Sequence, residues 1–382
     1  MNSLKNSKWV LAATVFFLTT VCVYAYPPDN AAVLYYKAAM LYEVDDEMAD
    51  MLVDLQKGKI EVNDKIREFV KKNRLIINTM LDATEVKNCD WGKDFSQGMD
   101  MQMPPLASLR KLARLVIVDA IILAEDKDYE EALSRCMSLY KMARHINDRV
   151  FIDYLVGLAI TGITNNCVMQ IMSDMPQDMQ SLTNLKNQLI KIDSIPFSIK
   201  PALLGEGEAV LMFMAPEHIY TTIRTCVEDE STKKELLSLV ADEEFLERNR
   251  KHFENYYADV IASFDMPYVE GYTAMENLDQ NLAKEAENYP LSTMLAPATH
   301  RIFSIKTRFE THDNAIKTAL ELYLIKAKTG KSPDELPAGL PKDLFSGKDF
   351  EYEKTADGFI LRCQGKDLGR DETYEYEFKV KK

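Results

Sequence analysis

The sequence predicts a mainly α fold, in which a multi-helix array of antiparallel helices is followed by a small C-terminal antiparallel β appendage. Apolar residues recur every three or four positions from Asp29 to about Lys328, which is the period of a helix with one buried face. After Gly330, prolines and glycines form a short linker, and short segments then alternate apolar and polar residues, as half-buried strands do. The chain has 382 residues, 47% of them hydrophobic, enough to bury a substantial core.

The first 25 residues have the composition of a secretory signal peptide. Lys5 and Lys8 precede the apolar run from Trp9 to Ala25, which ends in a small residue that permits cleavage. The run has 17 residues, at the short end of what spans a bilayer, so an uncleaved N-terminal anchor is the alternative. We therefore expect an exported protein of the periplasm or cell envelope, which contacts a membrane only through this segment if it is uncleaved.

The chain after the leader is strongly acidic. The leader holds two of the 46 basic residues and none of the 60 acidic ones, which leaves 44 against 60 and a net charge of −16 from Tyr26 onward. Such a surface repels nucleic acid and anionic lipid headgroups, so neither is an expected partner. The cysteines after the leader show no CxxC pair or regular spacing, and neither a disulfide framework nor a zinc site is indicated.

We expect the helical domain to span residues 26–330 and, if it forms two halves, to divide near 195–230. Asp29 is placed to cap the first helix, and the glycines and prolines of residues 87–105 predict a surface loop. Further helices are expected over residues 60–82, 112–125, 129–145, 149–174, 178–193, 231–264, 268–288 and 291–328. The apolar steps in the last of these alternate between three and four without a slip, which predicts one continuous helix.

The two helices that meet near residue 128 resemble a tetratricopeptide unit. Asp128 and Glu131 fit a capping box at the start of the second helix. The second-helix signature positions and the small residue of the first helix are occupied by Tyr129, Ala132, Cys136, Leu139 and Ala120. Asp119 departs from the pattern, because the family prefers leucine there, and so does Arg144, where a proline commonly closes the repeat. The resemblance implies one repeat-like hairpin and not an array.

Residues 331–382 are predicted to form a small β appendage packed on the last long helix. Three segments beginning at Phe350, Phe359 and Tyr374 alternate apolar and polar residues, and Asp357-Gly358 is typical of a hairpin turn. Three strands with one apolar face need a helix to cover that face.

The same tail resembles the end of a pseudopilin. A helix is followed by Gly330-Lys331-Ser332-Pro333 and by the turn Asp343-Leu344-Phe345-Ser346-Gly347, the order of that folding unit. Many pseudopilins bind calcium in a following loop, so the resemblance makes Asp367 and Asp371 the candidate metal ligands. Calcium takes six or more oxygens and this loop offers few carboxylates, so we expect no bound metal and no cofactor.

Three stretches together resemble a family of uncharacterised exported helical proteins from bacteria of the planctomycete type. They are residues 30–36, residues 143–146 with 154–160, and the C-terminal tail. The similarity is diffuse over most of the chain after the leader. It implies a helical fold and supplies no activity.

The candidates for catalytic residues are Glu206, Glu208 and His312. Glu206 and Glu208, each preceded by a glycine and leading into residues 209–214, are candidates for an acid and a base. The alternative is a pair of solvated carboxylates at a helix start. His312 lies within an apolar helical stripe, which favours a core histidine with one hydrogen-bond partner over a proton-transfer group.

Asp119 is the only charge in the apolar run from Leu115 to Leu123. An unpaired buried carboxylate costs several kcal/mol, so we expect a partner, from the following helix near residues 153–166. A polar network that fixes helix register and a binding pocket are the two interpretations. Asp119, Arg144 and His145 are the candidate binding residues.

The leading hypothesis is a non-catalytic helical scaffold or binding protein of the bacterial envelope, with grooves that accept a protein or peptide partner. The alternatives are an exported hydrolase that uses Glu206 and Glu208, and a protein that captures a small molecule between its helices.

Overall fold

The computed structural model describes residues 29–380, so the leader of residues 1–25 lies outside the described residues. The fold is mainly helical with a three-stranded antiparallel sheet near the C-terminus, which confirms the predicted fold class. The first helices are α2 (Ala31–Leu41), α3 (Asp46–Gln56), α4 (Asp64–Lys72), α5 (Arg74–Glu85), the 3-10 helix η1 (Phe95–Asp100), α6 (Leu106–Glu125), α7 (Tyr129–Ile146), α8 (Phe151–Asp174) and α9 (Met179–Asp193). They are followed by α10 (Lys200–Phe213), α11 (Ile219–Cys226), α12 (Glu230–Leu239), α13 (Glu243–Ser263), α14 (Tyr268–Lys284), α15 (Pro290–Leu295) and α16 (Thr299–Thr329).

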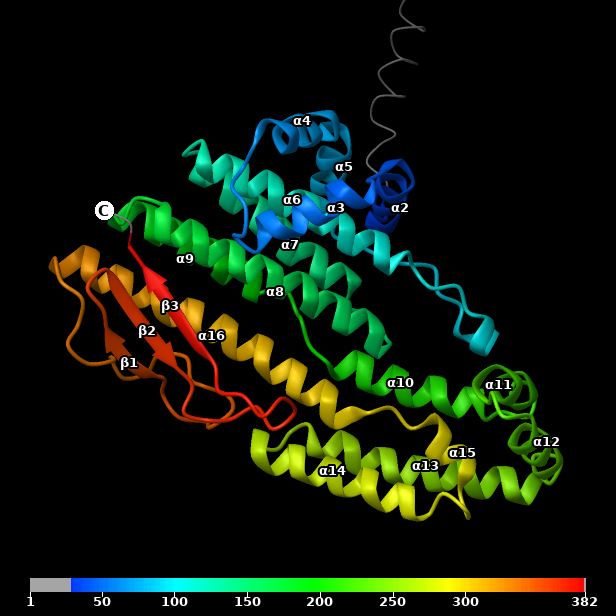
Figure 1. Cartoon of the computed structure of the whole chain (residues 1–382). Helices are drawn as coiled ribbons and strands as arrows, with labels where there is room; N and C mark the ends of the chain where they lie inside the picture. The colour runs from blue at the N-terminus through cyan, green and yellow to red at the C-terminus, as the bar shows by residue number, and fades with distance from the viewer. Residues whose placement is uncertain (1–28, 381–382) are drawn as a thin grey trace, which may run out of the picture.

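The long helix α16 lies across the middle of the molecule (Figure 1). The pair α8 and α9 packs along one side of it, α6 and α7 cover the far side of that pair, and α2–α5 pack around α6 and α7. The N-terminal half of α16 packs on α14, and the sheet lies along its C-terminal half. Segments far apart in the sequence therefore meet along α16.

Side-chain caps start many of these helices. Asn30, Asp45, Asn63, Asp128 and Asp178 each accept a hydrogen bond from a backbone N–H in the first turn of the helix that follows. Such a cap satisfies a donor that has no partner within the helix. The first cap is Asn30, not the predicted Asp29.

Several predicted helices are divided. The prediction of one helix over 291–328 was wrong, because Pro297 lacks a backbone N–H and holds the residue before it extended, which separates α15 from α16. The predicted helix 60–82 divides at Asn73, and the helix predicted over 231–264 divides between Leu239 and Glu243. Apolar spacing is nearly continuous across these breaks, so period alone did not show them.

Helix α8 forms the centre of the bundle and packs against α6, α7 and α16. Among the described residues, it is the helix whose length and hydropathy would allow it to cross a membrane. In the structure, 67% of that apolar window is buried.

The sheet has the order β1–β2–β3, with β1 (Glu351–Lys354), β2 (Gly358–Arg362) and β3 (Glu375–Lys379). Its buried face carries Phe359, Leu361 and Phe378. The face is tied to α16, since the Tyr323 hydroxyl donates to the Lys379 carbonyl at 3.1 Å.

Candidate functional site

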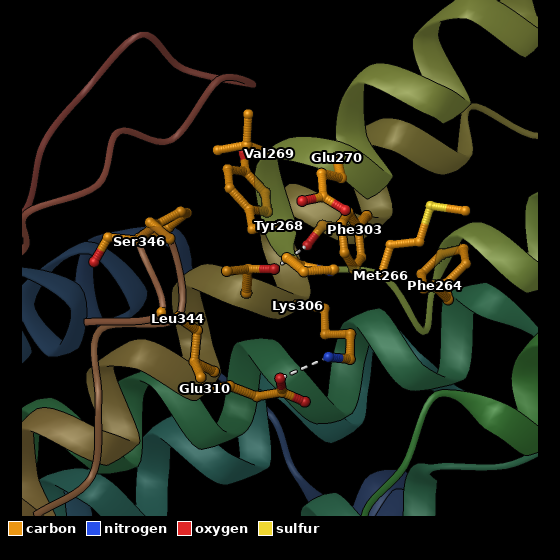
Figure 2. Close-up of a pocket in the computed structure, with 14 residues that line it drawn as sticks. Phe264, Met266, Tyr268, Val269, Glu270, Phe303, Lys306, Glu310, Leu344 and Ser346 are labelled. Atoms are coloured by element: carbon orange, nitrogen blue, oxygen red, sulfur yellow. Dashed lines mark hydrogen bonds and ion pairs between the residues drawn. The ribbon is translucent and has the colours of Figure 1, made fainter. Parts of the chain in front are cut away.

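The main candidate site is a cleft of 470 Å³ beside the N-terminal half of α16 (Figure 2). Three segments far apart in the sequence form it: residues 264–270 at the turn from α13 to α14, residues 303–310 of α16, and the turn at 344–347. Its apolar walls are Phe264, Met266, Pro267, Tyr268, Val269, Phe303, Leu344 and Phe345. Lys306 and Glu310 line one side of the cleft and form an ion pair with 2.7 Å between the ammonium and the carboxylate. We call this the α16 cleft.

The helix turn on one side of the α16 cleft depends on Gly271. A Cβ at this position would lie 2.5 Å from the Ser263 carbonyl oxygen and 2.9 Å from the Phe303 ring. Glycine therefore lets α14 fold back tightly on α13 and α16. The turn leaves Met266 and Val269 on the rim with 41% and 51% of their surfaces exposed, as unpartnered apolar side chains.

A buried carboxylate holds the opposite wall. Asp343 accepts hydrogen bonds from the Phe345 and Gly365 amides at 2.9 and 2.8 Å and from the Ser346 hydroxyl at 2.6 Å. These bonds fix the turn at 344–347 against the loop after β2, and the Phe345 ring meets Tyr268 edge-on at 4.9 Å. The wall is therefore set by hydrogen bonds as well as by packing.

Asp367, a candidate calcium ligand, binds Tyr268 in the wall of the cleft and Ser304 of α16. Its Oδ1 accepts from the Tyr268 hydroxyl at 3.0 Å and from the Ser304 hydroxyl at 2.6 Å, and its Oδ2 accepts from the Tyr374 hydroxyl at 2.9 Å. Arg308 lies 3.7 Å from the same carboxylate. Hydrogen-bond donors and a guanidinium occupy the space that a cation would need.

Asp371, the second candidate calcium ligand, is exposed and pairs with Lys366 at 2.5 Å. In the part of the chain that the structure describes, no group of three or more His, Cys, Asp or Glu side chains could hold a metal ion. Asp367 therefore acts as a hydrogen-bond acceptor that ties the tail to α14 and α16.

Glu206 and Glu208 do not face one another. Both lie in the interior of α10 and not at its start. In a helix, side chains two residues apart point in different directions. Glu206 accepts from the Phe151 amide at 2.9 Å, at the start of α8, and burial raises its pKa. Glu208 is exposed and pairs with Arg149. Glu206 therefore caps the start of α8 and Glu208 forms a surface ion pair, and the two carboxylates are not placed to act together as an acid and a base.

Asp119 is buried, as expected, but the predicted partner was wrong. Two arginines bind it: Arg74 donates to both carboxylate oxygens at 2.9 and 2.7 Å, and Arg135 donates to Oδ2 at 2.9 Å. Arg74 lies on α5, which the apolar period did not separate from α4. The three residues join α5, α6 and α7 in one network.

The other two candidate binding residues lie in different environments. His145 Nδ1 is 3.0 Å from the Tyr35 hydroxyl, and the His145 carbonyl accepts from the Trp91 indole at 2.7 Å. Burial lowers the pKa of His145 to about 4, so the imidazole is neutral near pH 7. Arg144 lines a second cavity, of 170 Å³, between α7, α8 and α16.

Sequence reasoning missed a buried ion pair in the predicted surface loop. Lys93 and Asp153 have side chains only 2% and 1% exposed and contact each other directly, and Asp148 lies 2.8 Å from the same ammonium. Lys93 sits 60 positions from Asp153, so no local pattern connects them. The signal that remained in the sequence was Asp153, a lone acid at the start of an apolar helix.

His312 gives the fold a predictable dependence on pH. Its Nε2 lies 2.9 Å from the Met169 sulfur, and its ring stacks on Tyr376 with 4.9 Å between centroids. Burial lowers its pKa from the usual 6.5 to about 4. As the pH falls, the unfolded chain takes up a proton before the folded chain does, so stability present above pH 6.5 is lost towards pH 4.

We therefore expect stability to depend less on pH in the His312→Phe variant. Between about pH 7 and about pH 5, its free energy of unfolding should fall by about 2 kcal/mol less than that of the wild type. Denaturant titrations at both pH values measure the difference. The same change in both proteins would contradict the burial of a neutral imidazole.

Comparison with known proteins found no matching family model, no matching curated protein and no matching solved structure.

Proposed function

We propose that this chain is a helical scaffold or binding protein of the bacterial cell envelope, and that the α16 cleft is where a protein or peptide partner docks. The observation that carries the proposal is the open apolar rim of the cleft, formed by Met266 and Val269. Methionine and aromatic side chains adapt to varied apolar partners and are enriched at binding surfaces. The volume of 470 Å³ lies within the range of about 300–1,000 Å³ typical of ligand pockets.

The polar groups of the cleft support a peptide as the occupant. Glu270 and the ion pair of Lys306 and Glu310 line its edge, beside apolar walls from the α13–α14 turn. An apolar anchor side chain would enter the cleft, while backbone and charged groups of the partner would meet this polar edge. Export to the envelope is part of the proposal and is supported by the composition of the first 25 residues.

Photo-crosslinking from the rim of the cleft tests this function. A photoreactive phenylalanine analogue at position 269, expressed in the native envelope, should form a discrete crosslinked product. The same analogue at Leu75, which is 66% exposed on α5, is the matched control and should form little or none. Mass spectrometry of the product identifies the partner.

A charge at the rim should then weaken binding of the identified partner. We expect the Val269→Glu variant to bind it at least about 10-fold more weakly, because a carboxylate would lose its water against the partner's apolar surface. The Leu75→Glu variant should bind normally. Equal crosslinking at positions 269 and 75, or unchanged affinity in Val269→Glu, would overturn the proposal.

A further inference from the structure

A second cavity, of 170 Å³, brings charges of both signs together with aromatic walls. It lies between α7, α8 and α16, and Glu310 lines both this cavity and the α16 cleft. Arg144, Asp193 and Asp313 line it together with the rings of Phe197 and Phe309. We call it the Arg144 cavity. Its volume is below the range of drug-sized pockets, so a small ligand is indicated.

The guanidinium of Arg144 is fixed in place and forms no direct ion pair with a carboxylate among the described residues, although Asp193 and Asp313 attract it from a longer distance. Its Nε donates to the Ile195 carbonyl at 3.0 Å, and its Nη1 donates to the Tyr140 carbonyl at 2.9 Å. The guanidinium also lies over the Phe197 ring, 5.6 Å from the centroid. Both acceptors are neutral and neither bond uses Nη2, so this cation remains available to a carboxylate.

Carboxylates of the opposite charge line the same cavity. Asp193 and Asp313 share one ammonium group, that of Lys317, at 2.8 and 2.7 Å. Arg144 balances the second carboxylate charge from a longer distance, and burial raises the pKa of Asp313. A ligand that carries both charges would contact the guanidinium and the carboxylates directly and would leave the net charge of the cavity unchanged.

The two aromatic rings that line the cavity, Phe197 and Phe309, pack directly against glycines of α8. A Cβ at Gly157 would lie 3.0 Å from the Phe197 ring, and a Cβ at Gly162 would lie 2.1 Å from the Phe309 ring. Without these glycines both rings would be displaced. The hydroxyl of Thr161, on the same helix, also lines the cavity, and among the described residues its buried oxygen has no hydrogen-bond partner. Such an orphaned polar atom is unfavourable unless a ligand or water satisfies it.

We propose that the Arg144 cavity binds a small zwitterion, an α-amino acid with an apolar side chain. Arg144 would receive its carboxylate, Asp313 and Asp193 its ammonium, and the space between Phe197 and Phe309 its side chain. Thr161 supplies the remaining hydrogen bond. This site is separate from the peptide-binding role proposed for the α16 cleft, since it depends on a different set of charges and on a ligand of a different size.

Calorimetric titration with three related compounds tests the proposal on the purified protein. L-phenylalanine carries both charges, 2-phenylethylamine lacks the carboxylate, and 3-phenylpropanoate lacks the ammonium. We expect saturable binding of L-phenylalanine, or of L-leucine if the cavity favours an aliphatic side chain. Each singly charged analogue should bind at least about 10-fold more weakly, because a charge-assisted hydrogen bond is lost.

Variants locate the binding. Arg144→Gln and Asp313→Asn should each weaken amino-acid binding at least about 10-fold. The control is Glu321→Gln, which lies on α16 like Asp313 and loses only an ion pair with Lys186 of α9. It should bind the amino acid as the wild type does.

If loss of the Tyr140 and Ile195 contacts unfolds Arg144→Gln, the affinity of Asp313→Asn is the test of the site. Equal affinity for an amino acid and its singly charged analogues, no binding of any of them, or a folded Asp313→Asn with unchanged affinity would overturn the proposal. Crosslinking at position 269 reports on the α16 cleft alone, so the two proposals can fail separately.

Discussion

Replacing Asp367 with alanine is expected to lower the free energy of unfolding by about 3 to 5 kcal/mol. The carboxylate is fully buried and accepts from Tyr268, Ser304 and Tyr374, with Arg308 at 3.7 Å. Alanine leaves these donors in the interior without an acceptor, and each unsatisfied group costs about 1 to 3 kcal/mol. Denaturant unfolding followed by circular dichroism measures the loss.

The effect should be local in origin. Amide hydrogen exchange should increase first in the loop around residue 367 and in β3, because Asp367 ties this loop to α14 and α16. Glu372→Ala, which removes an exposed carboxylate from the same loop, is the control and should change stability by less than about 0.5 kcal/mol. A loss below about 1 kcal/mol in Asp367→Ala would mean that water replaces the carboxylate at little cost, which would contradict the complete burial of Asp367.

The fold class was predictable because helix burial leaves a local record. The apolar period of 3.6 residues and the capping residues lie within one helix, so each helix can be recognised without its neighbours. The breaks were harder, since a helix can end while its apolar face continues. Pro297 was visible in the sequence and marks the break between α15 and α16. At Asn73 nothing as strong as a proline marks the boundary.

The candidate sites were only partly predictable, because cavities are made by residues that the sequence keeps apart. The α16 cleft combines residues 264–270, 303–310 and 344–347, and no pattern within any one of them indicates the others. Arg144 departs from the predicted repeat signature and lines a cavity. The sequence could not place Asp313 or Phe309 opposite it, because that depends on how α16 packs against α7 and α8.

Asp119 was recognisable as a lone charge in an apolar run, and replacing it with leucine is the second change with a large expected effect. Leucine is the residue that the tetratricopeptide pattern would predict at this position. In this chain, Arg74 and Arg135 point at the carboxylate. Removing one partner of a buried ion pair leaves uncompensated charge, so we expect Asp119→Leu to lose about 3 to 5 kcal/mol of unfolding free energy in denaturant titrations.

A second substitution should restore much of that stability. Arg135 is mostly buried, with 11% of its side chain exposed, whereas Arg74 is 43% exposed and can turn to water. In the Asp119→Leu variant, Arg135 keeps its ion pair with the exposed Glu131 at 3.0 Å but loses the acceptor of its buried Nε, so the larger loss is at Arg135. Replacing buried ion pairs by packed apolar groups is often neutral or stabilising, so the double variant Asp119→Leu with Arg135→Met should be more stable than Asp119→Leu alone. Arg74→Met in the same background is the control and should restore less. If neither second change recovers stability, the aspartate must act through something other than its two arginines, such as helix register set during folding.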